Sequence, residues 1–199
     1  MKPFWMALRA ALAAGLFSAS LAHAWGGPAA RVESTDGEVR VVGPDGAARA
    51  PKRGALVFTG EIVVTGRDAR AVLRFTDGGR FRLQPDTRLR IDDYRYSGKL
   101  DGDERSYISL IKGGLRAISG AIGRYSKPNF RLITPAATIG VRGTTYAIRY
   151  NDELIAAVSD GAIELCNGGG CQTAKRGEAY HVLAADSEAV LIAGPPELQ

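Results

Sequence analysis

Hydrophobic and polar residues alternate along short segments over most of this chain. Leu73 and Phe75 precede a turn and Phe81 and Leu83 follow it, and arginines stand between them. A period of two places alternate side chains on opposite faces of a strand, so each strand has a buried face and a wet face. The expected strands are 55–58, 61–64, 70–75, 80–84, 87–91, 106–111, 114–118, 130–133, 145–149, 153–158, 161–165, 178–182 and 188–192. No convincing helical period follows residue 24, so the pattern predicts an all-β fold of many short antiparallel strands.

Turn signals separate these segments. The Asp-Gly pairs are Asp36-Gly37, Asp45-Gly46, Asp77-Gly78, Asp101-Gly102 and Asp160-Gly161. The pairs at Asp36, Asp77 and Asp160 lie between alternating segments, which predicts a β-hairpin at each. The chain has 25 glycines and 9 prolines among 199 residues, which agrees with a fold rich in turns. Residues 97–105 are polar and charged, and we expect them to form an exposed loop.

The first 24 residues have the pattern of a cleavable export signal. Lys2 and Arg9 precede the uncharged run 10–21, and Ala22-His23-Ala24 provides small residues around a cleavage site. The uncharged run is shorter than the roughly 20 residues that a membrane helix needs. We therefore expect cleavage before Trp25, no membrane span afterwards, and a periplasmic or secreted mature domain of residues 25–199.

The charge balance gives no support for a nucleic-acid partner. The chain has 26 basic and 21 acidic residues and a net charge of +5. Loss of Lys2 and Arg9 with the signal would leave about +3. This excess is too small to indicate nucleic-acid binding.

The two cysteines, Cys166 and Cys171, enclose residues 167–170, which include three glycines. An exported chain meets an oxidising compartment, where paired cysteines normally form a disulfide. Free thiols and a metal site are the alternatives. Two thiols and His181, the only histidine after residue 24, are too few for a four-ligand zinc site.

The segment 134–146 reads TPAATIGVRGTTY. Pro135 restricts the backbone, and Gly140 and Gly143 allow it to turn or to approach another strand closely. This segment resembles the signature of the FecR domain family, carried here by Thr134, Pro135, Gly140, Val141, Arg142, Gly143 and Thr144. Shorter and less specific motifs of the family occur in the family's order at 60–66, 75–89, 110–116 and 158–161. The resemblance therefore covers about residues 31–192.

The resemblance to FecR proteins implies a twisted, solenoid-like or sandwich-like single β domain. In well-known members this domain is the periplasmic part of a membrane-anchored regulator that contacts a receptor, while a cytoplasmic segment governs a sigma factor. The present sequence has a signal peptide where those members have a cytoplasmic segment and a membrane helix. The resemblance therefore implies a free periplasmic module with a periplasmic or membrane protein partner, and it does not imply direct sigma-factor control.

Catalytic signatures are not found in the sequence. There is no nucleophile elbow, zinc-protease motif or phosphate loop, and His181 lies in a strand-like segment where a structural role is the usual one. We expect no enzymatic activity, no cofactor and no metal. Arg142 has two interpretations, a structural arginine that binds turn carbonyls or a carboxylate, and a residue that contacts a partner.

One group of arginines suggests a binding face. The arginines that alternate with buried positions are Arg74, Arg80, Arg82, Arg88 and Arg90. If three adjacent strands carry them, they form one basic patch that could bind lipid headgroups, an anionic polysaccharide or an acidic partner. Alternatively the face is merely solvated and neutralised by nearby acids, namely Asp68, Asp77, Asp86 and Asp92. The sequence thus favours a protein-contact module in envelope signalling that uses exposed strand edges, with envelope-polymer binding as the second hypothesis.

Overall fold

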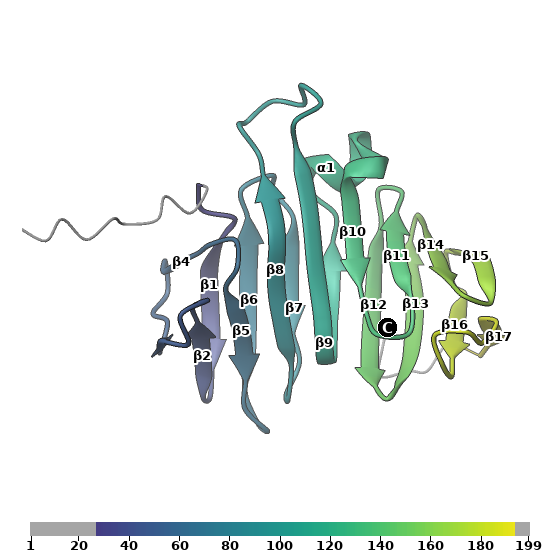
Figure 1. Cartoon of the computed structure of the whole chain (residues 1–199), viewed down its shortest axis with the longest axis horizontal. Coiled ribbons are helices and arrows are strands. Elements are labelled where there is room, and N and C mark those ends of the chain that lie inside the picture. The colour runs from purple at the N-terminus through teal and green to yellow at the C-terminus, as the bar shows by residue number, and fades with distance from the viewer. Residues whose placement is uncertain (1–26, 194–199) are drawn as a thin grey trace, which may run out of the picture.

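The computed structural model describes residues 27–193, and within this range the chain forms an elongated block of seventeen strands (Figure 1). A short helix α1 (Ala121–Tyr125) and a 3₁₀ turn η1 (Lys127–Asn129) lie between β9 and β10. The expected signal peptide, residues 1–24, lies outside the described residues, as do residues 194–199.

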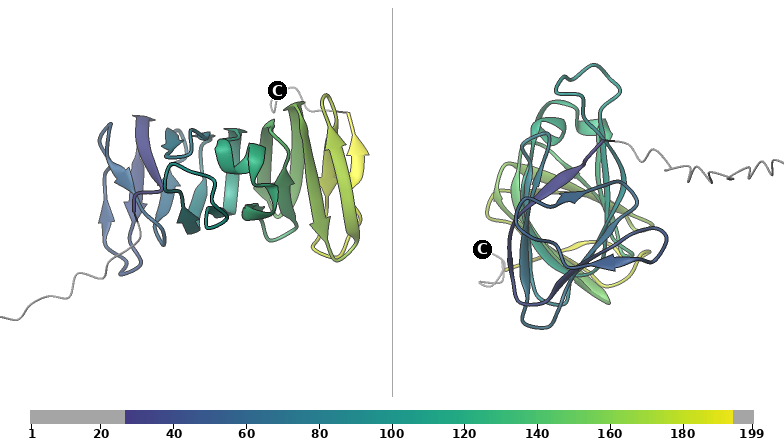
Figure 2. Two further views of the ribbon diagram at one scale, coloured as in Figure 1. Left: turned by 90° about the horizontal axis from the view of Figure 1, so that it is seen from above. Right: turned by 90° about the vertical axis from the view of Figure 1, so that its left-hand side faces the viewer.

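The strands are arranged in two layers that face each other. Layer one contains β4 (Leu56–Val57), β1 (Ala30–Asp36), β6 (Arg70–Phe75), β7 (Arg80–Leu83), part of β9 (Arg105–Ile118), β12 (Thr145–Asn151), β13 (Glu153–Asp160), β16 (Ala179–Val182) and β17 (Val190–Ile192). Layer two contains β3 (Ala48–Arg49), β2 (Val39–Val42), β5 (Ile62–Thr65), β8 (Arg88–Arg95), the rest of β9, β10 (Phe130–Ile133), β11 (Thr138–Val141), β14 (Ala162–Asn167) and β15 (Gly170–Lys175). Viewed along the long axis, the two layers lie face to face and give the molecule a flattened outline (Figure 2).

The long strand β9 joins the two layers into one continuous sheet. Up to Lys112 it pairs with β8 and β10 in layer two, and from Gly113 it pairs with β7 and β12 in layer one. Gly113 has φ +91°, and a Cβ there would lie 2.5 Å from the Thr87 Cα, so only glycine fits this crossing. The sequence pattern divided β9 into two strands because the two glycines at this point interrupt the alternation.

The all-β prediction is confirmed, and the solenoid-like arrangement agrees with it. All strand pairs are antiparallel except β9 with β10, which run parallel. Alternate residues of both layers fill the core, and Leu73, Leu83, Leu89 and Ile108 are fully buried. Apolar burial at about 25 cal/mol per Å² is therefore the main stabilising contribution.

Some Asp-Gly turns form β-hairpins, and others form corners at which the chain passes from one layer to the other. Asp77-Gly78 connects β6 and β7, which pair as the predicted hairpin. The hairpin prediction is wrong at Asp36-Gly37 and Asp160-Gly161, because each of these turns takes the chain from layer one to layer two. Gly161, with φ +79°, illustrates the reason: a left-handed glycine serves a corner between layers as well as a hairpin.

Buried threonines connect neighbouring corners of the coil. The Thr65 hydroxyl donates to the Gln84 carbonyl oxygen at 2.6 Å and accepts from the Thr87 N–H at 2.9 Å. The Thr87 hydroxyl donates to the Gly114 carbonyl oxygen at 2.9 Å and accepts from the Gly114 N–H at 3.0 Å. Backbone groups that a corner removes from the sheet are thereby satisfied inside the protein.

Candidate functional site

The first part of the signature segment forms a tight turn between β10 and β11. The Thr134 hydroxyl accepts from the Ala137 N–H at 3.0 Å and donates to the Ala137 carbonyl oxygen at 2.9 Å, and Pro135 lies inside this turn. In β11, Val141 is buried, while Gly140 leaves open space beside its backbone. This part of the signature shapes the chain path.

Thr144 connects three elements at the corner between β11 and β12. Its side chain is buried, and its hydroxyl donates to the Ala162 carbonyl oxygen at 2.6 Å and accepts from the Arg142 N–H at 3.1 Å. Its backbone N–H donates to Ser119 Oγ at 3.1 Å, and that hydroxyl donates to the Thr144 carbonyl oxygen at 3.0 Å. The corner therefore repeats the arrangement seen at Thr87.

Arg142 points away from this buried network. Its side chain is 55% exposed, and its guanidinium lies 3.8 Å from the Glu164 carboxylate on β14. Gly143 beside it has φ +68°, which explains the glycine at this position of the signature. Among the described residues the guanidinium forms this ion pair and no hydrogen bond to a turn carbonyl.

The structure separates the five arginines that the sequence analysis placed on one face. Arg74, Arg80 and Arg82 lie on the outer face of layer one, whereas Arg88 and Arg90 lie on layer two. The prediction that three adjacent strands carry all five is wrong, because β8 pairs with β5 and β9 and not with β7. Alternation shows which residues point outward from a strand, but it contains no information on which layer the strand joins.

Most arginines of layer two have acidic partners. Arg49 binds the buried Glu61 carboxylate at 2.5 Å, which raises the pKa of Arg49. Arg90 binds Asp92 at 2.5 Å and shares that residue with the Ser109 hydroxyl. Among the described residues the remaining ion pairs of this layer are Arg40–Glu38, Arg105–Asp93 and Arg142–Glu164.

Layer one has a different charge distribution. Two arginines that the sequence analysis did not include, Arg31 and Arg116, lie opposite members of the predicted set in the strand register. Both alternate with buried residues, so the same period-two signal identifies them. Among the arginines of this group, only Arg80 has an acidic partner in the described part of the chain, Glu33 at 2.8 Å.

The disulfide prediction is confirmed, and the free-thiol alternative is wrong. Cys166 on β14 and Cys171 on β15 are paired across the antiparallel hairpin, with Cα atoms 4.1 Å apart. The bridge closes the hairpin at one edge of layer two. Across residues 27–193, no three His, Cys, Asp or Glu side chains are grouped to hold a metal ion.

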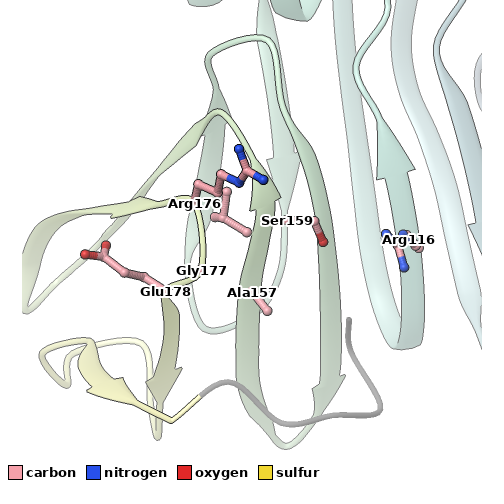
Figure 3. A pocket seen from close by; sticks show the side chains of 7 residues that line it. Arg116, Ala157, Ser159, Arg176, Gly177 and Glu178 are labelled. Atoms are coloured by element: carbon pink, nitrogen blue, oxygen red, sulfur yellow. The ribbon is translucent and has the colours of Figure 1, made fainter.

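His181 lies on β16 with its side chain 27% exposed. Its Nε2 is 2.8 Å from a Glu153 carboxylate oxygen that is half exposed. A separate hollow of about 340 Å³ on layer one is lined by Arg116, Ala157, Val158, Ser159, Arg176, Gly177 and Glu178 (Figure 3). Its lining contains no histidine or cysteine that could act as a base or a thiol nucleophile.

Comparison with known proteins places the chain in a family. The FecR protein family profile matches residues 61–164, about half of the chain. Two crystal structures of a candidate anti-sigma factor from Parabacteroides distasonis, at 2.50 and 1.65 Å resolution, have the same fold with a TM-score of 0.53 and 14% sequence identity. The match covers 68% of this chain and 61% of that protein, so the chain spans about three fifths of its length.

Two further comparisons complete the assignment. No curated protein matches this chain. No helix within residues 27–193 has the length and hydropathy to cross a membrane. The profile match includes the buried Thr144 corner and the turn at Thr134, and the chain belongs to the FecR protein family.

Proposed function

We propose that this protein is a non-enzymatic FecR-type module of the cell envelope that acts through protein–protein contact in signalling or regulation. Family membership supports this role, and so does the likeness of fold to a candidate anti-sigma factor. The Cys166–Cys171 disulfide supports export to an oxidising compartment, which is the periplasm or the exterior.

The open edge of layer one is the observation that carries the proposal. Among the described residues β17 pairs only with β16, so one side of β17 is available for a further strand. Val190 and Leu191 on this strand are 58% and 56% exposed. β17 is a short edge of three residues, and its side chains are apolar where natural edge strands often carry charges.

An extended segment of a partner protein fits this edge. It would add to layer one by backbone hydrogen bonds, and its alternate side chains would cover Val190 and Leu191. Leu183, 55% exposed just after β16, extends the same apolar region. The partner is thus a protein with an extended, apolar segment that can pair as a strand.

Affinity capture from an envelope extract tests the contact. The bait is the processed protein, the edge variant is Val190→Lys with Leu191→Lys, and the control is Leu100→Lys in the β8–β9 loop, where Leu100 is 42% exposed. We expect one discrete partner with the wild type and the control, and its loss with the edge variant. Capture of no protein, or of proteins that the edge variant retains equally, would contradict the proposal.

A further inference from the structure

Five arginines form two rows across the strands of layer one. In the first row Arg31 on β1 faces Arg74 on β6, which faces Arg80 on β7. In the second row Arg82 on β7 faces Arg116 on β9. We call these five residues the arginine ladder.

The ladder is unfavourable for the protein alone. Directly opposed side chains in an antiparallel pair have Cβ atoms about 4.5–5.5 Å apart, and like charges at this distance destabilise the sheet. The Arg80–Glu33 ion pair is the only one that the ladder makes among the described residues. The positive charge of the other four guanidinium groups is therefore left for solvent or a ligand.

The four acids expected to neutralise this face form no ion pair with the ladder among residues 27–193, and two of them have other partners. The Asp77 carboxylate accepts backbone N–H groups of Gly79 at 3.0 Å and Ile122 at 3.2 Å. Asp92 binds Arg90 on the opposite layer. No ion pair joins Asp68 or Asp86 to the ladder within residues 27–193. Most arginines of layer two are thus paired with acids, whereas four of the five ladder arginines have no ion pair among the described residues.

The spacing of the ladder indicates the shape of its ligand. Neighbouring strands are about 4.8 Å apart, and residues i and i+2 on one face are about 6.6 Å apart, so the guanidinium groups repeat across the strands. Guanidinium groups bind carboxylates and phosphates in a bidentate manner. A chain of anionic groups that runs along the long axis of the molecule would meet one arginine at each strand.

Two hollows lie beside the arginine ladder on the surface of layer one. The first, about 150 Å³, is lined by Arg80, Arg82, Arg116 and Ile118. Arg116 also lines the second hollow of about 340 Å³, which has Ala157 and Ser159 on one side and Arg176 beyond them (Figure 3). Arg116 therefore lies between two depressions of one surface, and a sugar ring could enter either depression while its acidic group binds an arginine.

The same surface is poorly suited to a protein or a membrane. Protein interfaces are organised around aromatic or other large anchors in pockets, and neither of the two hollows is lined by an aromatic residue. Ile118, 41% exposed, is the only large apolar side chain that lines the smaller hollow. Insertion into a lipid surface would require a larger exposed apolar face.

We propose that the arginine ladder binds a linear polysaccharide that carries carboxylate or phosphate groups, which lies across β1, β6, β7 and β9. This binding is separate from the strand-edge contact at β17. The two activities can therefore be lost independently by substitution.

The test compares two matched double variants of the full exported protein. Arg82→Glu with Arg116→Glu reverses a cross-strand pair of the ladder, and Arg88→Glu with Lys112→Glu reverses a cross-strand pair of layer two. Both change the net charge equally and both include a residue of β9. Arg82→Gln with Arg116→Gln is a third variant that removes the charges without introducing new repulsion.

Binding is measured on immobilised polygalacturonate, which presents carboxylates, and on phosphomannan, which presents phosphates. Poly-L-glutamate and phosphatidylglycerol vesicles serve as the competing ligand classes. We expect the wild type to bind at least one polysaccharide, with an affinity that falls at 1 M salt because the Debye length shortens to about 3 Å. The Arg82/Arg116 variants should bind at least about tenfold more weakly, while the Arg88/Lys112 variant stays within about twofold of the wild type.

Three results would overturn the proposal. Equal losses in the two charge-reversal variants would show that only net charge matters. Tighter binding to poly-L-glutamate or to the vesicles than to both polysaccharides would identify a different ligand class. No binding of the wild type to either polysaccharide at low salt would exclude the ladder as a polysaccharide site.

Discussion

Replacement of Thr144 by valine tests whether the FecR signature is a structural device. The substitution preserves the shape of the side chain and removes a hydroxyl that is 2.6 Å from the Ala162 carbonyl oxygen and 3.1 Å from the Arg142 nitrogen. Thr144 is 2% exposed, so water cannot replace the lost hydroxyl without rearrangement of the corner. The corner should therefore become less stable while its path is retained.

The size of the effect follows from the hydrogen bonds that the substitution removes. The Ala162 carbonyl oxygen keeps a hydrogen bond from the Arg142 N–H at 3.0 Å, so neither backbone group becomes wholly unpaired. The loss of one buried side-chain donor and acceptor then costs about 1–2 kcal/mol. For a domain of this size that corresponds to a decrease in Tm of about 2–8 °C.

Thermal unfolding followed by circular dichroism measures this decrease. Thr145→Val is the matched control, because Thr145 begins β12, is half-buried and makes no side-chain hydrogen bond among the described residues. We expect the control to change the Tm by less than about 2 °C. Equal Tm values for the two variants would refute a structural role for the Thr144 hydroxyl.

Three other perturbations have defined outcomes. Replacement of Cys166 and Cys171 by serine opens a six-residue ring and should lower the free energy of unfolding by about 2 kcal/mol in urea titrations, and an unchanged midpoint would contradict this. Gly161→Ala should destabilise more than Gly78→Ala, because both have positive φ but only at Gly161 would a Cβ lie 2.6 Å from a carbonyl oxygen; equal Tm losses would refute the steric argument. Hydrogen bonds from Ser126 and from backbone N–H groups lower the pKa of Glu104 from 4.5 to about 2, so its stabilisation is complete above pH 4.5 and is lost as the pH falls towards 2. The Tm difference between the wild type and Glu104→Gln should therefore shrink over that range, and a constant difference would show that the carboxylate charge has no part.

Local features of the sequence were sufficient to predict the fold class and most of the strands. Alternation identified the inward positions of β6, β7 and β13, because burial of one face imposes a period of two. The expected strands did not include β1, β2, β3, β11 and β15, and β11 and β15 each contain glycine and few large apolar residues. Both strands are held by pairing with β14, which β11 meets from about 25 residues away in the sequence and β15 meets across a tight hairpin.

The layer of each strand could not be predicted, and this limited the analysis of the binding face. An Asp-Gly turn has the same local chemistry in a hairpin and in a corner, so Asp77 and Asp160 look alike in sequence. The consequence was the assignment of Arg88 and Arg90 to the wrong layer. Arg31 was missed because β1 was not among the expected strands, and Arg116 was missed because its strand was not placed beside β7. The disulfide was easier to predict, since its two cysteines lie in one hairpin.

Site-specific photo-crosslinking at β17 tests the proposed protein contact most directly. A photoreactive amino acid replaces Leu191 in the full chain expressed in its native cells, and the same replacement at Leu100 is the control for exposure. We predict one discrete crosslinked protein from position 191, lost when Val190 is changed to lysine, and no such product from position 100. Crosslinks of equal yield from both positions, or none from position 191, would contradict a partner strand at this edge.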